Sequence, residues 1–320
     1  MIWRTICKRC KAIARNMVSP DSGKIGSRGM RIAINFRYIL FILVVLYGNI
    51  FLPAPAFSQN HTNIEFKDQG QVVRTLSLAD LGSITATVSL KVFEAHEKRE
   101  RTYQAYPVWP LFDHIFGKTW QQAEEIVFTS ADGYQPSIPV ARFLAHDAYF
   151  AFASSDDAPF TLINALQNNE LVQLGPLYLV WDNLQSKALL DDGASGMPYQ
   201  VIGVELTTLA IRYPNLSPPV HASPQVQRGF LHFRKHCMAC HTINGEGGGK
   251  APELNYPASV TEYLRSEYLT RWIENPTSIR YNTVMPPLAT GIPNWAIVTQ
   301  EIIAYLRAMS AAKRKPEKAP

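Results

Sequence analysis

The chain has 320 residues, of which 47% are hydrophobic and 18% charged, a composition typical of globular proteins and long enough for two domains. Its net charge of +5 comes from residues 1–58, which hold nine Lys or Arg and a single acid, Asp21. Residues 59–320 therefore carry a net charge of −3, and this mildly acidic balance argues against nucleic-acid binding.

The basic leader runs into an apolar stretch, residues 39–47, which is followed by small residues and prolines. A charged segment, a short apolar segment and small residues in this order are typical of a secretory signal, with cleavage after Ala56 or Ser58. The sequence therefore predicts a periplasmic protein that is soluble once the signal is removed. Residues 1–29 are an unstructured extension of this leader by our interpretation, since Met30 would be a more usual start.

An uncleaved leader is the alternative. The uninterrupted apolar stretch is shorter than the roughly 20 residues that span a bilayer, but the wider segment 38–54 could serve as an anchor. In that case the protein would stay associated with the membrane through its leader.

Between residues 59 and 214 the pattern changes to short alternating runs that are rich in β-branched residues and bounded by turn residues, which predicts strands. These runs are residues 83–92, 125–129, 177–180 and 199–206. Two segments between them, residues 106–116 and 140–145, favour helices. We therefore predict an α+β domain over residues 59–214, followed by a Pro-rich linker at residues 215–223.

The order of segments in this domain resembles the molybdopterin-binding fold of the sulfite-oxidase type. The likeness rests on residues 103–113, 129–134 and 175–180 and on a closing strand before Pro214. The resemblance implies a molybdenum centre held by a cysteine thiolate, but residues 59–236 contain no cysteine. We therefore expect a binding or scaffold domain without molybdopterin.

Titratable side chains in this domain do not form a recognised catalytic spacing, and structural roles are the simpler interpretation of them. They are His96, His114, His146, Asp113, Asp147, Asp156 and Asp157. The pair Asp132 and Gly133 is most simply a turn.

The strongest motif is C-x-x-C-H, formed by Cys237, Cys240 and His241. Two thiols at this spacing add to the two vinyl groups of haem, and the adjacent imidazole becomes an axial ligand of its iron. A thioredoxin-like motif would need a βαβ setting, and a zinc site would need a second pair of ligands, which do not follow. The motif therefore predicts one covalently attached haem c.

The residues around the motif support this prediction. Residues 224–236 predict a short helix that ends at Cys237, with Gly229, Phe230 and Phe233 on one face. A glycine on that face would let another helix approach closely while the two rings pack. The Gly-rich loop at residues 244–249 lacks the pattern of a phosphate-binding loop, and we interpret it as a wrap around a haem edge.

A second axial ligand should be Met or His, and Met285 lies in a loop that Pro286 and Pro287 stiffen. Met238 lies between the thiols and Met309 lies in the last predicted helix, so we favour Met285. The histidines before the motif remain alternatives, namely His221, His232 and His236.

Two further segments, residues 259–273 and 295–309, show helical apolar spacing and predict core-facing helices. The predicted buried faces consist of Tyr263, Leu264, Leu269, Trp272 and Ile273 in the first segment and Ile297, Ile302, Ile303, Tyr305 and Leu306 in the second. Either Trp272 or Tyr305 could also contact the macrocycle.

Residues 224–310 together resemble the small class I c-type cytochromes. The likeness rests on the glycine and phenylalanine before the haem motif, the Gly-rich turn with Pro252, the Trp272 segment, Met285 with Pro286, and the last helix. The resemblance implies an all-α domain with His241 and Met285 on opposite faces of the haem, and it implies single-electron transfer.

The sequence thus predicts a multidomain protein in which an α+β sulfite-oxidase-like domain precedes an all-α cytochrome c domain. The segments are a leader (1–58), the α+β domain (59–214), a linker (215–223), the cytochrome domain (224–310) and a tail (311–320). We expect an exported electron carrier, rather than a catalytic oxidoreductase, that exchanges electrons with a redox partner protein such as a membrane oxidase or dehydrogenase. Two alternatives are an oxidoreductase whose middle domain binds a substrate or pterin, with the cytochrome as acceptor, and a docking subunit of a membrane respiratory complex.

Overall fold

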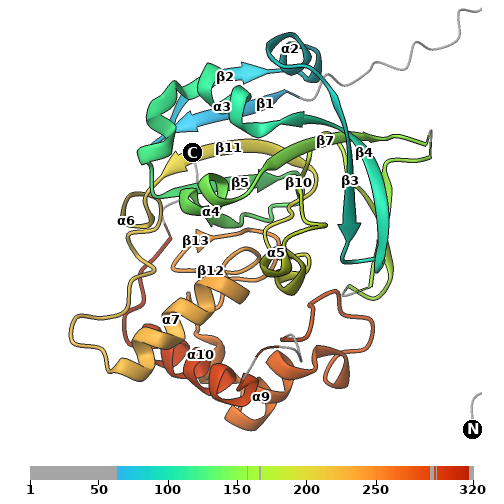
Figure 1. Cartoon of the computed structure of the whole chain (residues 1–320). Helices are drawn as coiled ribbons and strands as arrows, with labels where there is room; N and C mark the ends of the chain where they lie inside the picture. Colours follow the sequence, from blue (N-terminus) through green and yellow to red (C-terminus); the bar gives the residue numbers. More distant parts are fainter. Residues whose placement is uncertain (1–62, 157, 166, 289–291, 293, 317–320) are drawn as a thin grey trace, which may run out of the picture. The chain divides into compact units, whose positions relative to one another are not determined.

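The computed structural model describes residues 63–316, except residues 157, 166, 289–291 and 293 (Figure 1). The predicted signal or anchor lies outside these residues. Among the helices of the described part, none combines the length and the apolar character needed to cross a membrane.

The first two strands of the described chain belong to a five-stranded sheet with the strand order β2-β1-β11-β5-β6. β1 and β11 are parallel, and the other neighbours are antiparallel. The sheet therefore pairs the first strand of the middle region with its last strand. Its members are β1 (Ile64–Asp68), β2 (Gln71–Leu76), β5 (Glu125–Ser130), β6 (Ser137–Pro139) and β11 (Val201–Thr207).

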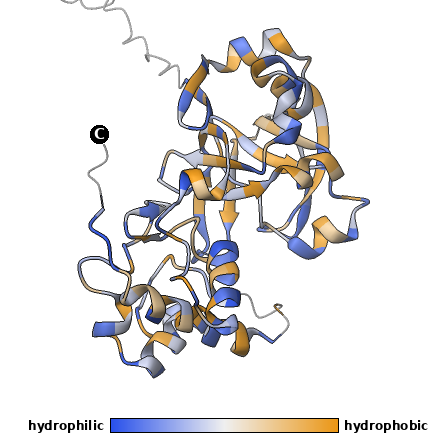
Figure 2. Cartoon of the chain, turned by 90° about the vertical axis from the view of Figure 1, so that its left-hand side faces the viewer, coloured by the Kyte–Doolittle hydropathy of each residue, from blue (hydrophilic) through white to orange (hydrophobic). Residues whose placement is uncertain are grey.

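A second, antiparallel sheet has the order β10-β7-β4-β3. It consists of β3 (Val88–Glu94), β4 (Arg99–Pro107), β7 (Ala148–Ser154) and β10 (Tyr178–Trp181). A separate hairpin pairs β8 (Thr161–Asn164) with β9 (Glu170–Gln173). Hydrophobic residues concentrate along the strands, whereas the C-terminal helices alternate between hydrophobic and hydrophilic positions (Figure 2).

Short helices connect these strands, and the longest of them, α3 (Val108–Phe116), buries Val108, Leu111, Phe112 and Ile115. This spacing places one helix face in the first hydrophobic core. The centre of the Phe112 ring lies 5.4 Å from the centre of the Trp120 ring and 6.2 Å from that of the Phe150 ring. The other connecting helices are α2 (Leu78–Ile84), η1 (Lys118–Gln122), α4 (Val140–Ala145) and α5 (Lys187–Asp192). A further short helix, α6 (Leu209–Arg212), follows β11.

The predicted strand at residues 83–92 is wrong at its start, because residues 83 and 84 end the helix α2. A capping box fixes the beginning of that helix: the Ser77 hydroxyl accepts from the Asp80 backbone, and the Asp80 carboxylate accepts from the Ser77 backbone. The strand begins only at Val88. The helix predicted over residues 140–145 is confirmed as α4.

The C-terminal region is built from helices around a second hydrophobic core. Its elements are α7 (Pro224–His236), β12 (Thr242–Ile243), β13 (Glu246–Gly247), α8 (Val260–Tyr263), α9 (Ser266–Glu274), η2 (Pro276–Ser278) and α10 (Trp295–Ser310). α7 begins where Ser223 caps it and Pro224 occupies its first turn. Leu216, in the segment predicted as a linker, is buried in the same core.

The single helix predicted over residues 259–273 is wrong, because two helices share this segment. Leu264 has an extended backbone (ψ 131°) and ends α8 before α9 starts at Ser266. The break turns Tyr263 outward, with 60% of its surface exposed, and Ile297 on α10 is 58% exposed. Both residues were predicted to face the core.

The contact between α7 and α10 confirms the predicted role of Gly229. A Cβ atom at this position would lie 1.9 Å from the carbonyl oxygen of Glu301, so only glycine fits. The rings of Phe230 and Phe233 pack 5.5 and 5.2 Å from that of Tyr305. The close approach thus brings both rings of α7 onto α10.

This contact predicts the effect of Gly229→Ala. The added methyl group would push α7 and α10 apart and lower the free energy of unfolding by about 1 to 3 kcal/mol, even though alanine favours the helix. Chemical denaturation followed by circular dichroism measures this change. Leu231→Ala is the control, because Leu231 lies on the same helix with 57% of its surface exposed. Equal stability of Gly229→Ala and the wild type would contradict the packing.

Candidate functional site

The C-x-x-C-H motif forms a tight turn at the end of α7. The backbone N–H of Cys237 donates to the carbonyl of Phe233 (2.8 Å), and the N–H groups of Cys240 and His241 both donate to the carbonyl of Cys237 (3.1 and 2.9 Å). Both cysteines are free thiols. The turn therefore brings the three predicted site residues together with both thiols available. We call residues 237–241 the attachment turn.

His241 is oriented by a hydrogen bond to the protein backbone. Its Nδ1 lies 2.8 Å from the carbonyl oxygen of Pro252, and because a carbonyl can only accept, Nδ1 carries the proton. This tautomer leaves the Nε2 lone pair free for a metal. Burial also lowers the pKa of His241, which favours the neutral imidazole that a metal ligand requires. Pro252 follows the Gly-rich loop in the sequence, and nothing in the sequence pattern predicts that its carbonyl holds this ring.

The two thiols differ from those of a redox-active C-x-x-C motif. Burial raises the pKa of Cys237 to about 12 and that of Cys240 to about 11. Thioredoxin-like motifs instead lower a cysteine pKa in order to stabilise a thiolate. The environment of these thiols therefore does not favour disulfide exchange.

The Gly-rich loop packs directly on the attachment turn. A Cβ atom on Gly248 would lie 1.9 Å from the carbonyl oxygen of Ala239, and one on Gly247 would lie 2.3 Å from that of His241. Gly247 also has a φ of +121°, which only glycine adopts readily. The loop thus supports the backbone that carries the thiols, so its glycines are needed for close approach.

Met285 lies in a loop that is tied to the second core. Leu288 donates its N–H to the carbonyl of Ile273 (3.0 Å) and packs against that core. The other two candidate methionines, Met238 and Met309, are each 1% exposed within the core. Met285 is half-buried, and its assignment as an axial ligand stays a prediction.

The histidines before the motif have other surroundings. His232 Nε2 lies 3.2 Å from a carboxylate oxygen of Glu301. Burial lowers the pKa of His236 to about 4, and its ring stacks against that of His232 on α7. His221 is exposed before α7.

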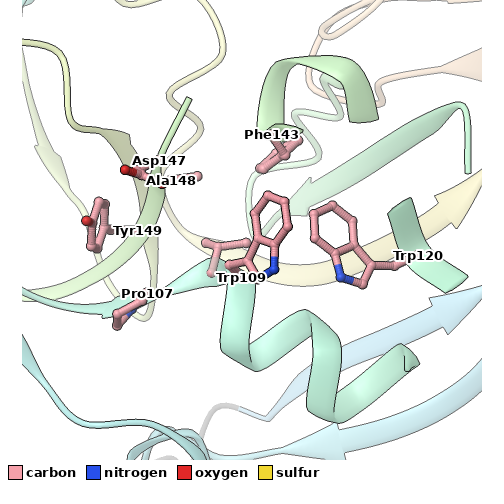
Figure 3. Close-up of a pocket in the computed structure, with 8 residues that line it drawn as sticks. Pro107, Trp109, Trp120, Phe143, Asp147, Ala148 and Tyr149 are labelled. Carbon is pink, nitrogen blue, oxygen red and sulfur yellow. The ribbon is translucent and has the colours of Figure 1, made fainter. Parts of the chain in front are cut away.

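Two tryptophans line a small pocket in the middle region (Figure 3). Trp109 and Trp120 meet edge to face with ring centres 5.1 Å apart, and Trp120 Nε1 donates to Asp113 (2.8 Å). Asp147 and Tyr149 lie on the other side. The pocket holds about 40 Å³, whereas sites for organic cofactors span roughly 300 to 1,000 Å³. It does not fit a pterin, and Asp113 has a structural role.

Sequence reasoning missed a contact between the middle region and the attachment turn. The predicted turn at Asp132 and Gly133 is confirmed, since Gly133 has a φ of +87° and its N–H donates to Ser130. Close to this turn, Gln135 donates its N–H to the carbonyl of Ala239 in the attachment turn (2.7 Å), and Gly249 of the Gly-rich loop donates its N–H to the carbonyl of Gly133 (2.9 Å). More than a hundred residues separate the two segments, so no local pattern could have indicated this contact.

Comparison with known proteins identifies the C-terminal region. A family model described as Cytochrome c matches residues 226–310, a little over a quarter of the chain. No curated protein matches the chain significantly. The protein is therefore multidomain: a mixed α/β region of sheets precedes a cytochrome c domain, which implies covalently bound haem c and haem-based electron transfer.

The assignment of Met285 as an axial ligand predicts the outcome of Met285→Ala in the haem-loaded protein. Loss of the thioether would replace a low-spin, six-coordinate absorption spectrum with a high-spin one, because alanine offers the iron no ligand. His221→Asn is the control and should leave the spectrum unchanged. A low-spin spectrum that persists in Met285→Ala would contradict the assignment.

Proposed function

We propose that this protein is an exported one-electron carrier whose single haem c is bonded to Cys237 and Cys240 and ligated by His241 and Met285. One observation carries the proposal: the attachment turn presents two free thiols beside an imidazole whose Nδ1 is already engaged by Pro252. This combination suits covalent attachment and axial ligation at one place.

The chain's own residues would hold the group and exclude water. Cys237 and Cys240 would fix it next to His241, and Pro252 keeps the imidazole in one orientation with Nε2 available. Phe233 and Tyr305 are fully buried beside the turn, and the Tyr305 hydroxyl donates to the carbonyl of Leu216 (2.8 Å). Haem iron held by His and Met supplies reversible one-electron chemistry at a relatively high potential.

We propose further that the middle region has a sulfite-oxidase-like fold without a molybdenum centre. The support is the absence of cysteine from residues 59–236, since a molybdenum of that type needs a thiolate. In this proposal the middle region is a binding or scaffold module, and the chain exchanges electrons with a redox partner protein instead of transforming a substrate.

Covalent attachment predicts the haem content of the protein. Protein produced with the c-type haem maturation machinery should retain haem after denaturation, at one iron and no molybdenum per chain. Replacing Cys237 and Cys240 together with serine should abolish this retention, because serine hydroxyls do not form thioethers with haem vinyl groups. The pyridine haemochrome spectrum and elemental analysis measure both. Non-covalent haem in the wild type, or one molybdenum per iron, would contradict the proposal.

Export predicts where the haem-loaded protein is found. The basic leader with its apolar stretch at residues 39–47 supports secretion. Cell fractionation should recover the haem-loaded chain from washed periplasm, with a processed N-terminus. Recovery only from detergent-solubilised membranes with an intact N-terminus would favour the anchor and a docking role in a membrane complex, and recovery from the cytoplasm would contradict export.

A further inference from the structure

The middle region holds the attachment turn through its backbone. Gln135 donates its N–H to the carbonyl of Ala239 (2.7 Å), and Ala239 lies between the two haem-binding cysteines. A second backbone bond links Gly249 to Gly133 on the other side of the same contact (2.9 Å). A Cβ atom on Gly133 would lie 3.1 Å from the backbone of Gly249, so the two chains run in direct contact.

Side chains also interact where the Gly133 turn contacts the Gly-rich loop. Lys250 Nζ lies 2.6 Å from a carboxylate oxygen of Asp132. The same ammonium lies 6.0 Å from the ring centre of Tyr134 and 5.8 Å from that of Tyr199. The next residue, Ala251, donates its N–H to the carbonyl of Cys240 (2.9 Å). Two tyrosine rings of the middle region therefore lie around a segment that is bonded to the second haem-binding cysteine.

A second contact reaches the loop that carries Met285. Asn168, in the loop between β8 and β9, donates from its side-chain amide to the carbonyl oxygen of the Asn282 side chain. Asn282 lies three residues before Met285. The middle region thus contacts both loops that would flank the haem, the one with the thiols and the one with the thioether.

Buried residues of β5 also contact the C-terminal region. Glu125 of β5 is 6% exposed and accepts a hydrogen bond from Arg234 of α7 (3.1 Å). Val127 of the same strand belongs to the second hydrophobic core. Because Val127 packs in the core of the C-terminal region, buried apolar contacts hold the two regions together in addition to the connecting segment.

We propose that the middle region is a built-in cover of the haem edge beside Cys240, so that electrons reach this edge across Tyr134 and Tyr199. The inference rests on the proposed function, since it takes Cys240 as a haem attachment point. A thioether bond to Cys240 would hold the haem next to this residue, so the segments that contact the attachment turn would cover the haem on that side. A redox partner must then recognise a surface made of both regions. The step moves one electron between the partner and the iron, with no bond formed or broken.

The test measures how fast small reagents oxidise the reduced, haem-loaded full chain in a stopped-flow instrument. Two oxidants of opposite charge are compared, ferricyanide and a cobalt(III) tris-phenanthroline complex. Tyr134→Ala should raise both rates several-fold, because it opens the cover without changing the charge. Tyr134→Phe retains the ring and should match the wild type.

Asp132→Asn provides a second variant that keeps every ring and breaks the ion pair with Lys250. It should also raise both rates, and it should speed hydrogen–deuterium exchange in residues 245–251, whether or not haem is bound. Glu100→Gln is the matched control, since it removes the same charge from the exposed pair with Lys91.

Unchanged rates in Tyr134→Ala and Asp132→Asn, with folded protein by circular dichroism, would overturn the cover. Opposite changes for the two oxidants in Asp132→Asn, with none in Tyr134→Ala, would also overturn it, because charge alone would then explain them. Failure of the proposed function gives a different result, namely a wild-type chain without covalent haem.

Discussion

The crossing of α7 and α10 at Gly229 is the contact on which the rest of the C-terminal site depends. α7 ends at His236, directly before Cys237, so the position of this helix sets the position of both thiols and of His241. The absence of a side chain at Gly229 lets the α10 backbone approach, and Tyr305 then packs against Phe233 one turn before the motif. The need for glycine at one position of α7 thereby determines where the thiols and the imidazole of the attachment turn lie.

Glycines also allow a close backbone approach in the Gly-rich loop. Gly248 allows the loop to lie on the carbonyl of Ala239, and the chain continues to Pro252, whose carbonyl holds the His241 ring. The attachment turn is therefore enclosed by backbone on several sides. Such preorganisation suits a carrier, because a metal ligand held in one orientation changes little between two redox states.

The parts of the molecule that sequence predicted well are those fixed by neighbours along the chain. The helix from Pro224 to His236 has its cap, its first-turn proline and its glycine within one segment. The sequence-based predictions are wrong where interactions between distant residues, or competing local interactions, determine the structure. The capping box at Ser77 takes residues 83 and 84 from a predicted strand, and the break at Leu264 divides a segment whose apolar spacing looked continuous. The parallel pairing of β1 with β11, and the contact of Gly133 with Gly249, join residues far apart in the chain, for which a single sequence has no signal.

A spectroelectrochemical titration measures whether the chain carries one electron on one haem. A chain with a single one-electron haem gives an absorbance that follows one Nernst transition, in which a tenfold change in the ratio of oxidised to reduced protein takes about 59 mV. A two-electron slope of about half that value, several separate transitions, or no reducible haem band would contradict a single one-electron haem.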